Sequence, residues 1–158
     1  MHWVSCAMWL AVLQVGLSIA LAQSESPIGT WKTFDDKTGR PRSIVQITEQ
    51  DGALTGKVIQ VLESPDGQHP LCKACKGERK DQPVEGMTIL WGAKRKGASW
   101  SDGEILDPEN GKIYRVTLTP LHGGEKLDVR GYIGVPLIGR SQVWRRQEDK
   151  TSPSGEEP

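Results

Sequence analysis

The sequence predicts an all-β protein, a single antiparallel up-and-down β-barrel of about eight strands. Short runs rich in Val, Ile, Thr, Trp and Tyr recur along the chain, and turn-forming residues bound each of them. No stretch keeps the 3.6-residue apolar period of an amphipathic helix. The first run carries Trp31, and the last carries Arg145 and Arg146, whose guanidinium groups suit the face of an indole. We expect these three residues to bring the first and last strands together, which closes the sheet without a free edge.

The first three expected strands are separated by two turn signals. Residues 35–39 end in a glycine that is available for a positive φ, and Gln50-Asp51-Gly52 is typical of a tight hairpin. Apolar residues alternate on one face of the second and third runs, as half-buried antiparallel strands require. These strands are expected to cover residues 30–34, 43–49 and 53–62.

Five more strands follow a long polar connection, residues 63–86. The expected turns lie at 94–97, at the Pro- and Asn-Gly-containing segment 107–111, and at His122-Gly123-Gly124. The strands are expected to cover residues 87–91, 98–106, 112–119, 126–133 and 140–146. The last two strands are joined by Gly134 to Gly139, an unusually apolar connection.

The N-terminal residues have the features of a signal peptide. Residues 1–22 contain no Lys, Arg, Asp or Glu, and they end in the small-x-small pattern Ala20-Leu21-Ala22. The leader lacks the usual basic residue, so Met8 is an alternative start, and a retained N-terminal anchor is the competing interpretation. We expect residues 1–22 to be removed, residues 23–147 to form the barrel, and the Ser-, Pro- and Glu-rich residues 148–158 to form a disordered tail. The expected location is therefore the periplasm or the outside of the cell.

The charge balance argues against two classes of partner. The chain has 20 Lys and Arg and 20 Asp and Glu, all of them after residue 22, and no basic patch stands out. A nucleic acid or an anionic membrane surface is therefore not expected as a partner. No second apolar run follows the leader, so we expect no transmembrane span in the mature chain.

Cys72-Lys73-Ala74-Cys75 is the one compact reactive motif, and it allows three interpretations. In an exported protein a structural disulfide that ties down the long connection is the first expectation. A redox pair needs a stabilised thiolate, for which only nearby lysines are available. A zinc site would add His69 to the two sulfurs, with Glu78 or Asp81 as a fourth ligand. We predict the disulfide, no metal site and no cofactor; a variant haem-attachment motif finds no evident axial ligand.

The sequence offers little support for catalysis. It contains no Gly-x-Ser-x-Gly motif, and the histidines after the leader are His69 and His122, the second of which lies in a predicted turn. The carboxylates between Asp102 and Glu109 do not have the spacing of a calcium loop, and Asp107 and Glu109 have a turn role. We therefore expect a protein that is not an enzyme.

The aromatic residues are more informative about binding. In a small barrel they commonly fill the core, but some can line a cup at its open end that holds a small apolar molecule. Arginines near the apolar connection 134–139 are the polar candidates for the same cup. The predicted ligand-binding residues are Trp91, Trp100, Tyr114, Arg130, Tyr132 and Arg140.

Several motifs together resemble one bacterial family. They are GTWKT at 29–33, CKACKG at 72–77, GMTILWG at 86–92, DPENGKIY at 107–114, and the segment from Arg130 to Trp144. In these motifs the chain is similar to the small exported bacterial proteins catalogued as domain of unknown function two-one-four-seven. The resemblance implies a Gram-negative envelope protein with a lipocalin-like barrel, and it carries no established activity or catalytic residues. Gly29-x-Trp31 with a late arginine also resembles the calycins, of which the lipocalins are part.

The leading hypothesis is an exported barrel that binds a small hydrophobic or amphipathic molecule and catalyses nothing. Two alternatives come from other classes of protein. One is a thiol–disulfide redox protein that uses Cys72 and Cys75. The other is an envelope module that binds another protein through the connection 134–139.

Overall fold

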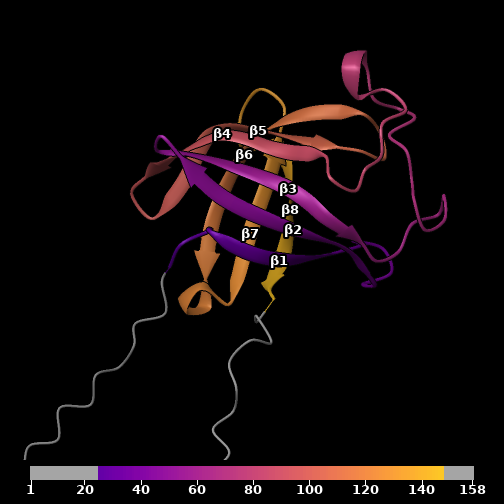
Figure 1. The fold of residues 1–158 in the computed structure, drawn as a ribbon. Helices are drawn as coiled ribbons and strands as arrows, with labels where there is room; N and C mark the ends of the chain where they lie inside the picture. The colour runs from indigo at the N-terminus through magenta and orange to yellow at the C-terminus, as the bar shows by residue number, and fades with distance from the viewer. Residues whose placement is uncertain (1–24, 148–158) are drawn as a thin grey trace, which may run out of the picture.

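The computed structural model describes residues 25–147, which form a closed barrel of eight antiparallel strands (Figure 1). The predicted fold class is thereby confirmed. The strands are β1 (Gly29–Phe34), β2 (Pro41–Gln50), β3 (Ala53–Val61), β4 (Thr88–Lys96), β5 (Ser99–Asp107), β6 (Lys112–Leu121), β7 (Lys126–Tyr132) and β8 (Gly139–Arg146). Two short 3₁₀ turns, η1 (Gly77–Arg79) and η2 (His122–Gly124), are the helical elements of this range. The predicted signal peptide 1–22 and the tail 148–158 lie outside the described residues.

Each strand pairs with the next one along the chain, and β1 also pairs with β8. The β2–β3 hairpin turns at Asp51 and Gly52, both at positive φ (52° and 74°), as a two-residue turn with matching twist requires. Within residues 25–147 no helix has the length and apolar character needed to cross a bilayer.

Strand β4 differs most from its predicted bounds. It continues to Lys96 instead of ending at Trp91, and the turn predicted at 94–97 shrinks to Gly97-Ala98. Gly92, at φ 76°, is the extra residue where the β3–β4 register shifts between Leu54 and Thr55. A β-bulge of this kind bends a strand without ending it. Strand β4 therefore continues past Gly92 to Lys96.

The interior of the barrel is packed with apolar side chains. Trp31 on the first strand, β1, and Trp144 on the last strand, β8, both lie in this core. The largest fully buried side chains on the other strands are Val45, Ile47, Leu54, Val58, Leu90, Val116, Leu118 and Leu127. Burial on this scale is the main stabilising contribution in a barrel of this size.

The up-and-down topology places the connections at two ends. The segment 25–28, the β2–β3 and β4–β5 turns and η2 lie at the end that holds Trp31, which we call the plugged end. The β1–β2 turn, the long connection, the β5–β6 turn and the β7–β8 connection lie at the other end, which we call the mouth. Figure 1 shows the long connection with η1 standing away from the strands.

Candidate functional site at the mouth of the barrel

The plugged end is closed by Trp31 and Arg146. The Trp31 Nε1 donates a hydrogen bond to the carbonyl oxygen of Pro27 over 2.7 Å. The Arg146 guanidinium lies 4.3 Å from the centre of the Trp31 ring. It also donates to three carbonyl oxygens, those of Gly124 (2.5 Å), Ile28 (2.9 Å) and Ser26 (2.7 Å). This end is therefore sealed by a stacked pair that also ties down the entering chain.

Arg145 has a different place from Arg146. It pairs with Lys32 on the outer face of the barrel, because the neighbouring pair, Trp31 with Arg146, faces inward. Its guanidinium lies 5.2 Å from the centre of the Phe34 ring. Of the two arginines named in the sequence, Arg146 is thus the one in contact with Trp31.

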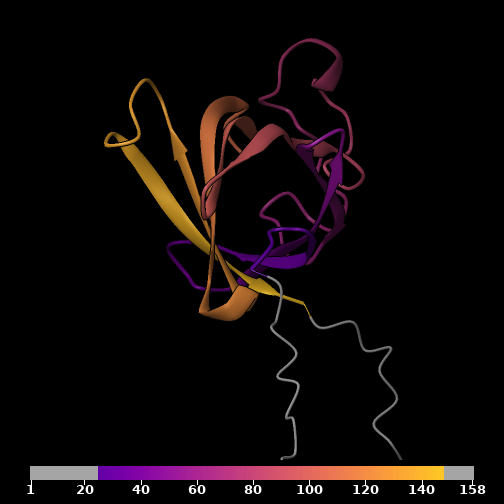
Figure 2. The ribbon, with the colours of Figure 1, turned by 90° about the vertical axis from the view of Figure 1, so that its left-hand side faces the viewer.

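The seam between β1 and β8 is short. The two strands are paired at Trp31–Arg146 and Lys32–Arg145, whereas β7 and β8 pair from Lys126–Arg145 to Tyr132–Gly139. Figure 2 shows the β7–β8 hairpin leaning away from the neighbouring strands toward its tip. Backbone pairing therefore closes the barrel at the plugged end and leaves the seam open toward the mouth.

Side chains bridge the open part of the seam. Gln142 Nε2 donates to Asp36 Oδ2 over 3.1 Å, and Arg140 Nη1 lies 3.2 Å from the same oxygen. Asp36 belongs to the β1–β2 turn, so it links the two edge strands where their backbones do not. Because the Asp36 carboxylate is half-exposed, these two contacts contribute only modestly to holding the edges of β1 and β8 together.

The inner face of the barrel becomes polar near the mouth on one side. Trp144 on β8 is buried opposite Leu127. Alternation therefore places Gln142 and Arg140, two and four residues before Trp144, on the same inner face and closer to the mouth. Thr33 and Ser43, which share a hydrogen bond of 2.8 Å between their hydroxyls, continue this polar side onto β1 and β2. The polar wall is thus built from β1, β2 and β8.

The opposite side of the mouth is more apolar. Tyr114 and Ile105 are paired across β5 and β6 on the inner face, and both are half-buried. Gly131 lies beside them: a Cβ there would stand 3.6 Å from the Tyr114 Cβ, so the glycine leaves the ring room. Ile133, at the end of β7, is 63% exposed. The mouth therefore has an apolar wall facing a polar one.

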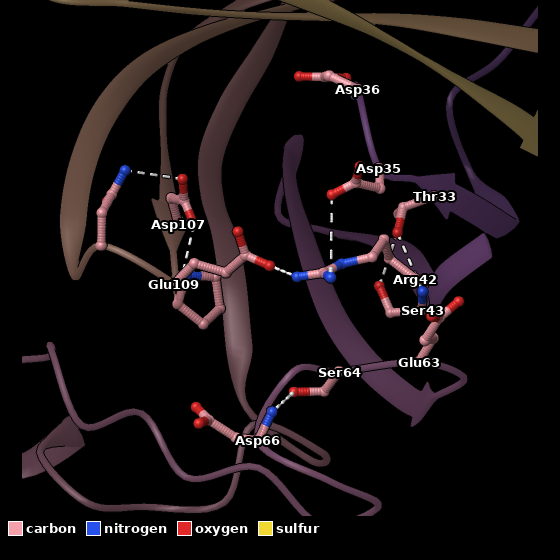
Figure 3. Close-up of polar contacts among 12 residues, drawn as sticks. Thr33, Asp35, Asp36, Arg42, Ser43, Glu63, Ser64, Asp66, Asp107 and Glu109 are labelled. Atoms are coloured by element: carbon pink, nitrogen blue, oxygen red, sulfur yellow. Dashed lines mark hydrogen bonds and ion pairs between the residues drawn. The ribbon is translucent and has the colours of Figure 1, made fainter. Parts of the chain in front are cut away.

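A group of charged residues covers the rim between the β1–β2 turn and the β5–β6 turn (Figure 3). Arg42 reaches toward two carboxylates: it forms an ion pair with Glu109, and its Nη1 lies 3.9 Å from Asp35 Oδ2. Hydrogen bonds from the backbone and hydroxyl of Thr38 hold the pKa of Asp35 below its ordinary value. Asp35 is therefore ionised at neutral pH and used within its own turn.

Asp107 is the carboxyl at the end of β5, where the β5–β6 turn begins. It accepts hydrogen bonds from the Glu109 backbone N–H (2.9 Å) and from Asn110 Nδ2 (2.8 Å), which also lies 3.1 Å from the Tyr114 hydroxyl. Burial raises the pKa of Asp107, while the positive charge of Arg140 opposes part of that rise. Asp107 thus links the charged rim to the apolar wall.

The structure separates the six predicted ligand-binding residues into three places. Tyr114 and Arg140 lie at the mouth. Trp100 lies at the plugged end, where Arg95 stacks over it at 5.3 Å. The other three, Trp91, Arg130 and Tyr132, lie on outward-facing positions of their strands.

Trp100 lines a hollow of about 500 Å³ at the plugged end, together with Glu25, Ser26, Glu49, Gly52 and Arg95. The ring itself is only 4% exposed. The hollow therefore offers mostly polar groups to a ligand.

Most of the mouth residues were not predicted as ligand-binding residues, among them Ile105, Asp36, Arg42 and Gln142. Asp36 reads as an ordinary turn residue, and nothing local shows that it meets β8 more than a hundred positions later. Gln142 lies two residues before Trp144 and therefore on the same face of β8. Its place at the mouth could be predicted only if the inward face of β8 were already known.

Cys72 and Cys75 lie at disulfide distance, with Cα atoms 5.3 Å apart. Both are buried, with Cys72 fully so, and the Cys72 Sγ lies 3.3 Å from the Pro108 carbonyl oxygen. A Cβ at Gly111 would overlap the Ala74 carbonyl, so the motif packs directly on the β5–β6 turn. The pair thus fastens the long connection beside the mouth. Within residues 25–147 no group of three or more His, Cys, Asp and Glu is placed to hold a metal ion.

Comparison with solved structures and with known proteins supports the fold and the family. A Helicobacter pylori protein, described as "Protein HP1028 from the human pathogen Helicobacter pylori belongs to the lipocalin family", is 17% identical, with a TM-score of 0.70 over 80% of this chain and 86% of that one. At that identity the likeness concerns the fold, which is lipocalin-like. No curated protein matches the chain. Residues 29–146 match the family described as "Uncharacterized protein conserved in bacteria (DUF2147)", and the chain belongs to that family.

Proposed function

We propose that the protein is an exported binding protein, without catalytic activity, that takes a small amphipathic molecule at the mouth of the barrel. One observation carries the proposal: the mouth has an apolar wall of Ile105 and Tyr114 that faces a polar wall ending in Arg140. Ligand sites typically combine apolar surface with a few placed polar groups in this way. The lipocalin-like fold supports the same kind of function.

The charges at the mouth favour an anionic head group on the ligand. Asp35 and Glu109 are engaged with their own turn or with Arg42, and Asp107 accepts hydrogen bonds from the Glu109 backbone N–H and from Asn110 in its own turn. Arg140 is 68% exposed and pairs with Asp36 alone among the ion pairs of the described residues. Its guanidinium therefore retains donors for a carboxylate, sulfonate or phosphate.

The mouth is a better site for an amphipathic ligand than the hollow at the plugged end. In that hollow Trp100 is almost fully buried, and the other lining groups are mainly polar or charged. The mouth exposes part of Tyr114 and most of Ile133. Burial of these side chains by a ligand would contribute roughly 25 cal/mol for each Å² of apolar surface removed from water.

The export and ligand parts of the proposal are tested together by native mass spectrometry of protein from a periplasmic fraction. The mass should correspond to loss of residues 1–22 and to a disulfide between Cys72 and Cys75, with a further non-covalent component. Protein found in the cytoplasm at full length would contradict the export part. Added dodecanoate should bind, and dodecyltrimethylammonium should bind less well because it lacks the anion.

Two arginines on neighbouring strands give a matched pair of variants. Arg140→Gln removes the guanidinium at the mouth and should weaken dodecanoate binding about tenfold, in line with the loss of one charge-assisted hydrogen bond. Arg130→Gln removes an arginine that faces outward and donates to the Pro136 carbonyl (2.7 Å), and it should leave the affinity unchanged. Equal effects of the two substitutions, or chemical-shift changes centred on Trp100, would place the site elsewhere.

The burial of Cys72 and Cys75 does not favour the thiol–disulfide alternative, because a redox thiol must reach its partner. The interaction module stays a prediction. The connection 134–139 does expose Val135, Leu137 and Ile138, with Leu137 at 91%.

A further inference from the structure

A row of four side chains crosses the outer wall of the barrel. Trp91 on β4 is paired with Glu104 on β5, Glu104 with Arg115 on β6, and Arg115 with Tyr132 on β7. They face outward because the residues beside them, such as Leu90 and Val116, are buried in the core. Trp91 and Tyr132 thus flank an acid and a base in one outward-facing row, in which Tyr132 is itself buried.

The wall is hollowed beside Trp91. A depression of about 230 Å³ is lined by Trp91, Gly92, Asp102, Gly103, Glu104 and Arg115. Two irregular positions create it: Gly92 at φ 76°, and Asp102 at φ 64°, where the β5–β6 register shifts. A Cβ at Gly92 would have its nearest neighbour, the Gly103 Cα, at 4.0 Å, so the missing side chain leaves open space there. Paired bulges of this kind commonly re-aim side chains at a functional surface.

The indole of Trp91 is held in place from two directions. Its Nε1 donates to Glu104 Oε2 over 2.9 Å, and the Arg79 guanidinium lies 4.8 Å from the ring centre. Arg79 comes from η1, in the connection that the cysteine pair fastens. The ring is half-buried, so part of it stays available at the depression. An aromatic ring fixed at a partly open surface is a preorganised platform.

Both signs of charge surround this platform. Asp102 forms an ion pair with Lys96 and lies 3.7 Å from Arg115 Nη2. Arg115 is 54% exposed, and Glu104 is exposed too and uses one of its oxygens for Trp91. The depression therefore offers carboxylate acceptors and guanidinium donors a few ångströms apart.

This mixture of groups selects against simple ions. An anion would meet Asp102 and Glu104, and a cation would meet Arg79 and Arg115. A polyhydroxyl ring suits both, because each hydroxyl donates to a carboxylate and accepts from a guanidinium. Its apolar C–H face also packs on an indole. The volume lies below the usual 300–1,000 Å³ of drug-sized ligands, so it fits one ring rather than a larger molecule.

We propose that the outer wall between β4 and β6 binds one pyranose unit of a carbohydrate, packed against the part of Trp91 that lines the depression and hydrogen-bonded by Asp102, Glu104 and Arg115. This site is on the outer face of the sheet, whereas the walls of the mouth are on its inner face. The proposal therefore does not depend on the ligand proposed for the mouth. In this proposal Arg79, from η1 in the long connection, has the role of holding the Trp91 ring in position.

The test is an NMR titration of the full chain with diacetylchitobiose and with maltose. At least one disaccharide should shift the Trp91 indole N–H and the Gly92 and Gly103 amides in a saturable way. Glu104→Gln keeps an oxygen for the Trp91 N–H but removes the charge, and it should weaken binding about tenfold. Lys57→Ala removes an exposed outward charge on β3 and should have no effect.

A steric variant tests the depression itself. Gly92→Asn should fill the space and abolish the shifts, because Asn tolerates a positive φ better than other side chains. Gly97→Asn is the matched control: it has a φ of 64° in the β4–β5 turn and open space around it, and it should bind as the wild type does. Unchanged spectra in the other residues show that both variants fold.

Three results would overturn the proposal. In the first, neither disaccharide moves the Trp91 indole signal at tens of millimolar. In the second, Gly92→Asn binds as well as Gly97→Asn. In the third, sodium acetate produces the same shifts, which would make the depression an anion contact.

Discussion

At the scale of single residues, two charged groups face the interior of the barrel and are handled in opposite ways. Arg146 stays charged: burial lowers the pKa of its guanidinium, but three carbonyl oxygens and the Trp31 ring stabilise the cation. Asp107 has amide partners, yet burial outweighs them and raises its pKa. The first arrangement seals one end of the barrel, and the second leaves a carboxyl at the other end that is easier to protonate.

Replacement of Trp31 tests the seal. Trp31→Ala should lower the free energy of unfolding by about 3–5 kcal/mol, because it empties a fully buried site and leaves the Pro27 carbonyl and Arg146 without their partner. Urea denaturation followed by circular dichroism measures the loss. Trp31→Phe keeps the stacking surface and should lose clearly less, whereas an unchanged midpoint in Trp31→Ala would show that the ring is not packed as described.

The raised pKa of Asp107 predicts a pH dependence. A carboxyl with a higher pKa when folded is protonated more readily in the native state, so its contribution to stability is present below its unfolded pKa and is lost as the pH rises through its folded pKa. Carbon-13 NMR of the Asp107 carboxyl should titrate above 3.8. Arg140→Gln should move that midpoint further upward, because it removes the largest opposing charge. A midpoint at or below 3.8 would contradict the burial of this group.

At the scale of elements, the long connection between β3 and β4 is ordered by contacts at both of its ends. Near its start the Leu62 and Glu63 amides donate to the Arg42 carbonyl, and near its end Gly86 N–H donates to the Val58 carbonyl. Between these points, Leu71 and Pro83 form an isolated bridge beside the cysteine pair. The segment is therefore a fastened loop, which is what a connection of this length requires in a small domain.

The cysteine pair should stabilise this loop by a limited amount. For so short a closed ring the chain-entropy relation gives about 2 kcal/mol, so the double variant Cys72→Ser, Cys75→Ser should lose roughly that free energy of unfolding. Hydrogen exchange should rise mainly between residues 63 and 86. Wild-type protein treated with a phosphine reductant provides the control and should resemble the variant; a protein indifferent to both treatments would lack the cross-link.

The β1–β8 seam is the least paired part of the sheet, and Asp36 is its bridge. Asp36→Ala removes the contacts to Gln142 and Arg140, so amide exchange at Ser141 and Val143 should quicken while Leu127 stays protected. Asp66→Ala, on the exposed loop, is the matched control and should leave β8 unaffected. Equal exchange in the two variants would mean that the bridge does not hold the seam.

At the scale of the whole molecule, closure makes every strand depend on two neighbours. The chain of pairings runs from β1 through β8 and back to β1, and one core cluster includes residues from all eight strands. Such a structure is expected to unfold in one cooperative step. Tryptophan fluorescence and far-ultraviolet circular dichroism should give coincident urea transitions, because Trp31, Trp100 and Trp144 lie in the same core. Separate transitions would show that the mouth and the plugged end fold independently.

Much of this architecture could be predicted from local patterns. Alternation in segments such as 126–133 and the Asp51-Gly52 turn predict strands and hairpins, since both depend on a residue and its immediate neighbours. The candidate site could be predicted less well. Trp91 and Tyr114 were grouped as one cup, yet they face opposite surfaces, because the bulge at Gly92 and the register of β5 decide which way each side chain points.

The all-β class, the order of the strands and the pairing of the first strand with the last could all be predicted from the amino-acid sequence. These features follow from a period of two, from turn residues, and from an indole and a guanidinium at the two ends. Three other features depend on the three-dimensional arrangement of the strands: Arg146 rather than Arg145 covers Trp31, Asp36 bridges to Gln142, and Trp91 and Tyr132 share an outward-facing row. The physical reason is that facing and proximity depend on register summed around a closed sheet, and one extra residue in a bulge reverses them.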